Sequence, residues 1–199
     1  MSLTYCDAAP GHVFHGPYHE DEYGFPSSDD RVLFERLVLE INQAGLSWLT
    51  ILKKREAFRS AFDNFDIDRV AGYGDADRAR LLADAGIIRN RLKVDATIEN
   101  ARRIVALRAE FGSFDGWLRA HHPLSKAEWI KLFKRTFRFT GGEIVGKFLM
   151  SLGYLPGAHQ RHCPVWTRVE ALDPPWMNAI RQGFTGYDAR ALGETLPTP

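Results

Sequence analysis

Apolar residues recur at the three- and four-residue spacing of an amphipathic helix along almost the whole chain, and this pattern constrains the fold more than any other feature. The alternating pattern that is typical of half-buried strands is nearly absent. The most regular stretch is residues 75–112, DADRARLLADAGIIRNRLKVDATIENARRIVALRAEFG. The sequence therefore predicts an all-α protein.

Start and stop signals divide the rest of the chain into shorter helices. One helix should begin at the N-cap candidates of residues 27–30 and end at Gly45, and another should cover residues 47–62. Further helices are expected at residues 67–72, 113–120, 125–135, 141–152 and 176–182. Residues 7–28 are typical of a loop, and the sequence from Pro164 is typical of an appendage of low regularity. We therefore expect a main domain over residues 1–163 and a C-terminal extension over residues 164–199.

The composition narrows the class of protein. The 199 residues are 45% hydrophobic and have a formal net charge of +1, which is ordinary for a globular chain. No apolar run approaches the roughly 20 residues of a membrane span, and no signal-peptide pattern is present, so we expect a cytoplasmic protein. Residues 1–50 hold 2 basic and 8 acidic side chains, whereas the remaining residues hold 24 and 17. This basic excess is compatible with a polyanionic partner.

The segment ADAGIIRNR, residues 83–91, predicts a tight turn between two helices. We expect the first helix to end at Gly86 as a glycine C-cap. Amides at the start of the next helix have no intrahelical partner, so they can bind a DNA phosphate, with Arg89, Arg91 and Lys93 adding positive charge. The alternative is an ordinary helical turn with solvated charges.

Residues at the two ends of the chain could hold a metal ion. The segment HQRHC, residues 159–163, contains His159 and Cys163, and the N-terminal region contains Cys6 and His19. Zinc favours tetrahedral sets of thiolates and imidazoles, so such a site would join the two ends and stabilise the fold. Competing ligands in the same segments are His12, His15 and His162. Unrelated cysteines and histidines, or a disulfide between the two cysteines, are the alternatives.

Two further features suggest a binding site. Residues 15–24, HGPYHEDEYG, could line a pocket with ring faces, or Tyr18 and Tyr23 could instead cover the core. Glu40 interrupts the apolar stretch LVLEINQAGLSWLTIL. It could form a surface ion pair with Arg36, or it could be a half-buried carboxylate that faces a ligand.

Four blocks, in this order and spacing, resemble the signature of the DNA-3-methyladenine glycosylase I family: YHEDEYG, LEINQAGLSWLTILKKREAFR, DAGIIRNRLKVDATIENA and HQRHC. The similarity spans about residues 4–163. It implies an all-α helix–hairpin–helix DNA glycosylase fold with a zinc snap that joins the N- and C-terminal segments. It also implies an enzyme of base excision repair, a monomer that hydrolyses the N-glycosidic bond of 3-methyladenine, or of another alkylated base, flipped out of double-stranded DNA.

The resemblance also implies roles for individual residues. Glu40 would contact the base, with Trp48 stacking on it and further base contacts from Tyr18, Tyr23 and His15. The DNA-contacting residues would be Leu46, Gly86, Ile87, Ile88 and Arg89. The ligands of a structural zinc ion would be Cys6, His19, His159 and Cys163. Ala8, His15 and Tyr23 stand where the family usually has tryptophan, tyrosine and tryptophan.

Two other functions stay open at this point. The chain could be a DNA-binding or lesion-sensing protein of the same fold that excises no base. It could also be a zinc hydrolase with Glu40 as the base, but that chemistry needs an open metal position, which two cysteines and two histidines would close.

Overall fold

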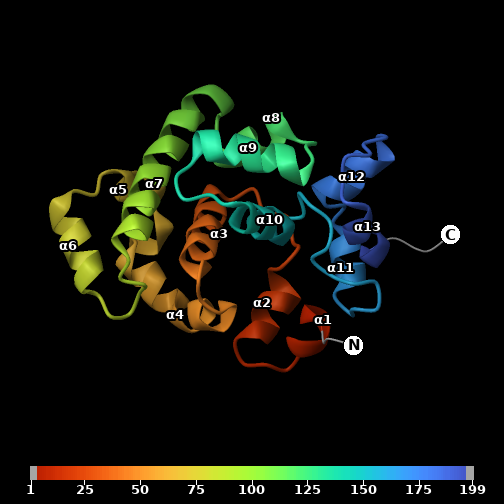
Figure 1. Cartoon of the computed structure of the whole chain (residues 1–199), viewed down its shortest axis with the longest axis horizontal. Helices are drawn as coiled ribbons and strands as arrows, with labels where there is room; N and C mark the ends of the chain where they lie inside the picture. Colours follow the sequence, from red (N-terminus) through yellow and green to blue (C-terminus); the bar gives the residue numbers. More distant parts are fainter. Residues whose placement is uncertain (1–3, 196–199) are drawn as a thin grey trace. The chain divides into compact units, whose positions relative to one another are not determined.

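The computed structural model describes residues 4–195, and every regular element in that range is a helix (Figure 1). The predicted all-α class is therefore confirmed. The chain divides into two compact units. Unit 1 comprises Met1–Pro26, His122–Trp129 and Gly146–Pro199, and unit 2 comprises Ser27–His121 and Ile130–Val145.

Unit 2 is built around α3, whose residues from Leu33 to Asn42 are all buried. Its complete helices are α3 (Asp30–Gln43), α4 (Trp48–Ala61), α5 (Ile67–Ala71), α6 (Asp75–Ala83), α7 (Arg91–Phe111) and α8 (Phe114–His121). A short 3-10 helix, η1, covers Asp63–Phe65. The end of α9 (Lys126–Thr136) and the start of α10 (Gly142–Ser151) also belong to this unit.

One buried carboxylate on α3, that of Glu35, is paired with arginines of the next helix. Glu35 is 7% exposed, and its Oε1 accepts hydrogen bonds from Arg55 Nε at 2.6 Å and Arg59 Nε at 2.9 Å. A buried carboxylate without such partners would be costly, so this pairing fixes α4 against α3.

The starts of α3 and α4 follow from their caps. The Asp29 carboxylate accepts a hydrogen bond from the Arg31 amide at 2.8 Å, and the Ser47 hydroxyl accepts one from the Thr50 amide at 3.2 Å. The predicted starts of both helices are therefore confirmed. Between them the chain turns through Gly45, whose φ of +81° is in the left-handed region that favours glycine.

The end of α6 differs from the sequence prediction. The helix ends at Ala83, and Gly86 is not among the residues with positive φ, so the predicted glycine C-cap was wrong. Instead, the Asp84 carboxylate accepts a hydrogen bond from the Gly86 amide at 2.7 Å. A Cβ on Gly86 would lie 2.9 Å from the Cβ of Ala57 on α4. Glycine is therefore required here by close packing and not by backbone conformation.

Unit 1 contains more helix than the sequence predicted. Its complete helices are α1 (Tyr5–Ala8), α2 (His15–Asp21), α11 (Trp166–Ala171), α12 (Pro175–Arg181) and α13 (Ala189–Thr195). Residues 7–28 are thus not simply a loop. The described part of the tail is also not an irregular appendage, because Trp166 and Trp176 are buried with ring centroids 6.3 Å apart. The helix predicted at residues 176–182 is confirmed as α12. The other four helices span two turns or fewer, which is too short for a helical period to be recognised.

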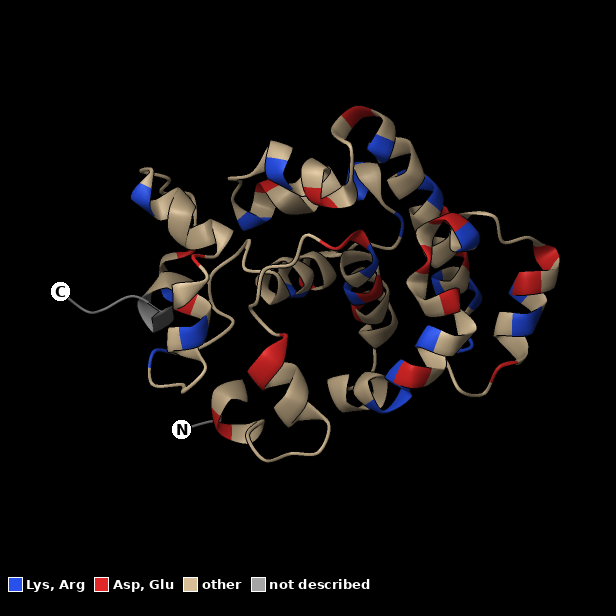
Figure 2. Ribbon diagram, turned by 180° about the vertical axis from the view of Figure 1, so that it is seen from behind, with Lys and Arg blue, Asp and Glu red and all other residues tan. Residues whose placement is uncertain are grey.

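Charged residues lie along the helices of unit 2, and acidic and basic residues follow one another on α6 (Figure 2). On α6, Arg78 donates a hydrogen bond to Asp95 of α7 at 2.9 Å, which joins these two helices. None of the helices within residues 4–195 is both long and apolar enough to cross a bilayer.

Candidate active site and metal centre

Two cysteines and two histidines meet in the interior of unit 1. They are Cys6 of α1, His19 of α2, and His159 and Cys163 of the segment after α10. Their ligand atoms all lie within 4.8 Å of one another, and all four side chains are buried. The structure therefore contains a Cys/His group that could bind a metal ion, and the group is the set that the family resemblance selects.

The spacing of the donor atoms fits four-coordinate binding. The Cys163 Sγ lies 3.5 Å from His19 Nε2 and 3.5 Å from His159 Nδ1, and Cys6 Sγ lies 3.8 Å from His159 Nδ1. In a tetrahedral zinc site, neighbouring sulfur and nitrogen ligands are about 3.5 Å apart. A divalent ion of the size of zinc could therefore bind between these atoms with little movement of the four side chains.

The hydrogen bond of His159 directs one ring nitrogen into the group. Its Nε2 donates to the carbonyl oxygen of Tyr23 at 2.6 Å, so Nδ1 carries the lone pair that faces the sulfurs. Burial lowers the pKa of His159 to about 4. The ring is therefore neutral at physiological pH, which is the form that binds a metal ion.

The thiols are also arranged for a cation. Cys6 and Cys163 are both free, so the disulfide alternative is wrong. Burial raises the pKa of the Cys6 thiol to about 11, because a thiolate in this interior is poorly solvated. A divalent cation would offset that cost. The competing ligand His162 is instead 63% exposed and lies 3.3 Å from Asp7.

Aromatic rings gather next to this group in unit 1. The rings of Tyr18 and Tyr23 are 5.7 Å apart, and Tyr5 lies 5.6 Å from Tyr23 and 5.5 Å from His15. The Tyr23 hydroxyl donates to Met150 Sδ at 3.0 Å. The structure thus brings the three predicted rings of residues 15–24 together and adds Tyr5, which the sequence analysis missed although it precedes Cys6 directly.

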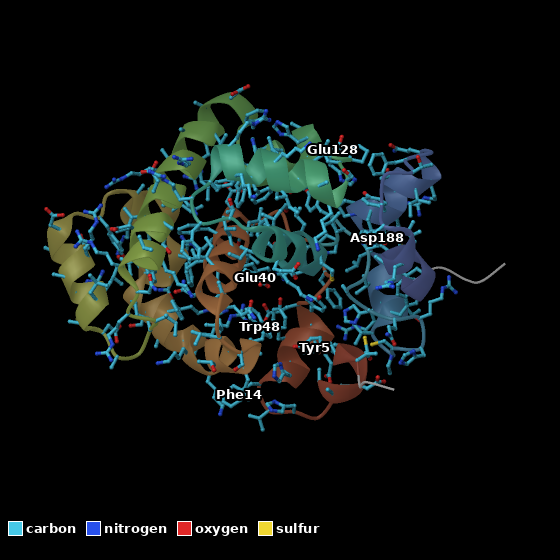
Figure 3. The ribbon with its side chains drawn as sticks, in the orientation of Figure 1. Tyr5, Phe14, Glu40, Trp48, Glu128 and Asp188 are labelled. Carbon is cyan, nitrogen blue, oxygen red and sulfur yellow. The ribbon has the colours of Figure 1, made fainter. Side chains whose placement is uncertain are left out.

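Glu40 and Trp48 lie on consecutive helices of unit 2 (Figure 3). Glu40, near the end of α3, is 5% exposed and Arg36 is 6% exposed, so the interpretation as a surface ion pair was wrong. Trp48 is the first residue of α4 and is partly buried. The intervening turn, residues 44–47, presents Leu46 with 40% of its surface exposed. One short turn therefore separates a buried carboxylate from a ring and carries an exposed apolar side chain.

The turn between α6 and α7, residues 84–90, offers backbone donors. The Gly86 amide is already bonded to Asp84, but within residues 4–195 the amides of Ile87, Ile88 and Arg89 donate to no acceptor. Arg89 is exposed and has no ion-pair partner in the described part of the chain. These are the properties of an anion-binding turn.

Lys93 does not add its charge to that turn, so this part of the prediction was wrong. Its side chain is 5% exposed, and Nζ donates to the carbonyl oxygens of Asn42 at 2.8 Å and Ala44 at 2.7 Å. No local sequence pattern indicates that Lys93 is buried, because both carbonyl acceptors lie about fifty residues earlier in the chain.

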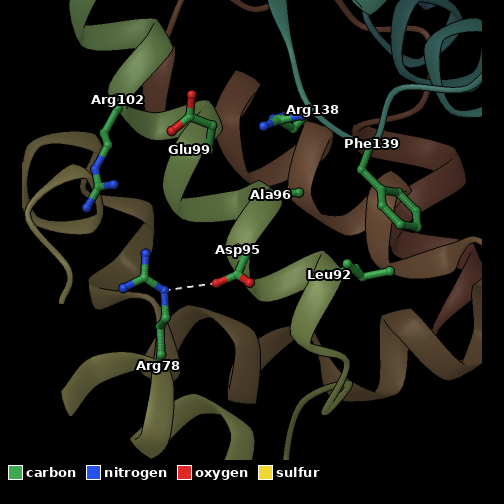
Figure 4. Close-up of a pocket in the computed structure, with 8 residues that line it drawn as sticks. All are labelled: Arg78, Leu92, Asp95, Ala96, Glu99, Arg102, Arg138 and Phe139. Carbon is green, nitrogen blue, oxygen red and sulfur yellow. Dashed lines mark hydrogen bonds and ion pairs between the residues drawn. The ribbon is translucent and has the colours of Figure 1, made fainter. Parts of the chain in front are cut away.

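A hollow of about 510 Å³ lies beside α7 in unit 2 (Figure 4). Its lining residues are Arg78, Leu92, Asp95, Ala96, Glu99, Arg102, Arg138 and Phe139. None of the predicted base-contacting residues is among them. Several of the lining charges are already paired within the protein, such as Arg78 with Asp95, so we do not assign the base-binding site to this hollow.

These features define an all-α protein with a buried Cys/His group that could bind a metal ion, a helical turn with unbonded amides in the described part of the chain, and a buried carboxylate on the helix before Trp48. Known proteins share this fold. The sequence profile of the methyladenine glycosylase family matches residues 12–129. The DNA-3-methyladenine glycosylase 1 of Escherichia coli is 38% identical over 159 residues, which cover 68% of this chain and 83% of that protein. The DNA-3-methyladenine glycosylase of Haemophilus influenzae is 36% identical over 169 residues, covering 75% and 91%.

Solved structures of 3-methyladenine DNA glycosylases are also similar to this chain. The 3-methyladenine DNA glycosylase I of Staphylococcus aureus, described for its recognition of 3-methyladenine, superposes with a TM-score of 0.74 at 30% identity, covering 83% of this chain and 97% of that one. A crystal structure of another 3-methyladenine DNA glycosylase I gives a TM-score of 0.68 at 36% identity, covering 75% and 92%. The chain belongs to the methyladenine glycosylase family, as its sequence blocks predicted.

Proposed function

We propose that this protein is a monofunctional DNA glycosylase that hydrolyses the N-glycosidic bond of 3-methyladenine in alkylated DNA. Its family and the activity in its relatives' names support this function. The structural observation that carries the proposal is the burial of Glu40 one short turn away from Trp48. A buried carboxylate interacts strongly with a cationic ligand, because water screens the contact only weakly.

The chemistry requires little acid catalysis. Methylation at N3 makes adenine cationic, which weakens the glycosidic bond, and departure of the base neutralises the charge. The enzyme therefore has to extrude the nucleotide, hold the base and admit water to the sugar. Discrimination against normal adenine can come from a desolvated contact to the charge that only the methylated base carries.

In this proposal Glu40 accepts a hydrogen bond from the exocyclic amine of the base and favours its cationic form. Trp48 offers its ring face for stacking, an interaction that tolerates any planar base and favours a cation. Further base-binding residues in the proposal are Tyr18, Tyr23 and His15. Because Tyr23 also accepts the hydrogen bond from His159, its backbone is fixed by the metal-binding group.

The proposed substrate is double-stranded DNA, held by a helix–hairpin–helix element made of α6, the turn 84–90 and α7. The amides of Ile87 and Ile88, with Arg89, would bind a backbone phosphate without reading the sequence. Gly86 contributes through its close packing, since its amide is occupied by Asp84. The exposed Leu46 would fill the gap that the extruded base leaves.

The proposed cofactor is one structural zinc ion held by Cys6, His19, His159 and Cys163. Two thiolates and two imidazoles form a closed shell, so the ion would stabilise unit 1 and leave no open position for substrate. When bound, the metal supplies a cross-link between α1, α2 and the segment after α10. This closed shell also disfavours the zinc hydrolase alternative.

Other aspects of the organisation stay predictions. They are the assignment of residues 1–163 to the glycosylase domain and 164–199 to an extension, the monomeric state and the cytoplasmic location. Residues 1–3 and 196–199 of these two regions lie outside the described part of the chain.

The function is tested by incubating the protein with duplex DNA treated with a methylating agent and separating the released bases by chromatography. We expect free 3-methyladenine, and none from untreated DNA of the same sequence. Binding to the methylated duplex without release of any base would contradict the proposal and favour the lesion-sensing alternative.

A further inference from the structure

The hairpin and the turn that presents Leu46 are linked by two lysine side chains in unit 2. Lys93, in the first turn of α7, reaches the carbonyl oxygens of Asn42 and Ala44 at 2.8 and 2.7 Å. In the opposite direction, Lys54 of α4 reaches the carbonyl oxygens of Ala85 and Gly86 in the hairpin turn at 2.9 and 3.0 Å. A side chain of α7 therefore binds the backbone at the end of α3, and a side chain of α4 binds the backbone of the hairpin turn.

The acceptors of Lys93 are the carbonyls at the C-terminal end of α3. Helix-end carbonyls have no intrahelical donor and lie at the negative end of the helix dipole, so a buried ammonium group is stabilised there. Lys93 has no carboxylate partner among residues 4–192, and burial lowers its pKa. The carbonyls of Asn42 and Ala44 are thus the main reason that a lysine can be 5% exposed at this position.

A third segment of unit 2 contacts the same ammonium group. Phe139, in the turn between α9 and α10, places its ring centroid 6.0 Å from Lys93 Nζ. The backbone of the neighbouring Arg138 binds the Asn100 side chain of α7: its amide donates to Oδ1 at 2.7 Å, and its carbonyl oxygen accepts from Nδ2 at 3.1 Å. The end of α3 and the turn that carries Phe139 therefore both contact the side chain of Lys93.

The turn 44–47 otherwise depends on local contacts. The Leu46 amide donates to the Gln43 carbonyl at 2.8 Å, and the Gln43 side chain donates to the Leu46 carbonyl at 3.1 Å. Both bonds stay within one turn and cannot fix its position relative to α7. The hydrogen bonds of Lys93 are the contacts that tie this turn to the helix that follows the hairpin.

We infer that Lys93 is a positioning residue that couples the grip on the DNA backbone to the extrusion of the base. By tying α7 to the turn 44–47, it sets the distance between the phosphate-binding hairpin and Leu46 and Trp48. Lys54 supports the same link from the other side. This inference rests on the proposed function for its effect on base release, but the coupling itself is a property of unit 2.

The test compares three variants of the full chain. Lys93→Met removes the donors while keeping the length of the side chain, and Lys93→Arg keeps a cation with donors. The matched control is Lys131→Met, which removes one exposed charge on α9 that has no partner within residues 4–192. The two readouts are amide hydrogen exchange and single-turnover release of 3-methyladenine.

For Lys93→Met we expect exchange in residues 44–47 to become about tenfold faster, since loss of a hydrogen bond to a charged group corresponds to at least that factor. Exchange in the buried middle of α3 should not change. Base release should fall about tenfold or more, while the Kd for undamaged duplex changes less than about threefold. Lys93→Arg should recover part of the release rate, and the control should match the wild type.

Several results would decide against the inference. Unchanged exchange in residues 44–47 of a folded Lys93→Met protein overturns it, as does a uniform rise in exchange throughout unit 2. If that variant does not fold, Lys54→Met tests the link from the other side, with faster exchange expected in residues 84–90 and unchanged exchange overturning it. If the wild type releases no base, the proposed function fails, and the exchange experiment still decides the coupling.

Discussion

At the scale of single residues, Glu40 combines burial with a position one short turn before Trp48. A surface carboxylate there would gain little from an ion pair, whereas a buried one contributes strongly to binding a cation because water does not screen the contact. Trp48 is partly buried. In the proposed function, Glu40 recognises the charge of the base and Trp48 stacks on it.

Replacing Trp48 with leucine should weaken the binding of free 3-methyladenine about tenfold or more, because stacking of a base on an aromatic ring contributes roughly 1–3 kcal/mol. The measurement is a calorimetric titration with the free base. Trp48→Phe is the matched control and should retain an intermediate affinity. Equal affinities for the wild type and the leucine variant would remove Trp48 from the site.

At the scale of elements, we propose different tasks for the hairpin and the turn 44–47. In the described part of the chain, the hairpin has three successive amides without a hydrogen-bond acceptor, from Ile87 to Arg89, and the exposed side chain of Arg89, which suits a phosphate of any sequence. The turn presents one exposed leucine beside Trp48. Backbone binding and base extrusion should therefore be separable by substitution.

Arg89→Ala should weaken binding to undamaged duplex and reduce the slope of log K against log salt by about 1, because one phosphate contact is lost. Fluorescence anisotropy at several salt concentrations measures this slope. The control is Lys131→Ala, which removes an exposed charge of α9 far from the hairpin in sequence. An unchanged slope in the Arg89 variant would show that this side chain contacts no phosphate.

Leu46→Gly should lower base release but leave binding to undamaged duplex nearly unchanged, whereas Arg89→Ala should weaken that binding. The hairpin is intact in this variant, so we expect the Kd for undamaged duplex to change less than about threefold. Release of 3-methyladenine should fall about tenfold or more, because the gap in the duplex is no longer filled. Leu46→Met keeps the apolar volume and should remain active. Wild-type release by the glycine variant would exclude a wedge function for Leu46.

At the scale of the whole molecule, the Cys/His group brings α1 and α2 together with a segment more than 130 residues later in the chain. The described tail contributes to the same interior, since Val165 and Val169 pack with Cys6 and Cys163. An ion at this site would act on the stability of unit 1 and not on the reaction.

The purified, reduced protein should contain one zinc ion per chain by elemental analysis. Cys163→Ser should lose the ion and lower Tm by roughly 10 °C, since a structural site contributes several kcal/mol and each kcal/mol shifts Tm by about 2–4 °C in a chain of this size. His162→Ala, at the exposed competing histidine, should change neither quantity. Absence of metal from the wild-type protein would refute the zinc proposal.

The sequence predicted those features that depend on local signals. The starts of α3 and α4 follow from the caps at Asp29 and Ser47, and long helices such as α7 show their period clearly. The metal-binding group could be selected among competing histidines only through the family resemblance, because its two halves are far apart in the chain.

Other features depend on contacts that no local pattern reveals. Gly86 is required by Ala57 on another helix, and Lys93 is buried by carbonyls of α3. Helices as short as α2 and α11 do not repeat often enough to be recognised.

The most direct test of the account is the single-turnover release of 3-methyladenine from methylated duplex DNA by the wild type and by Glu40→Gln. The amide keeps the size of the side chain but removes the charge, so we predict at least about a tenfold loss of release. Binding to undamaged duplex should remain close to that of the wild type. Equal release by the two proteins would contradict the central claim that Glu40 selects the methylated base.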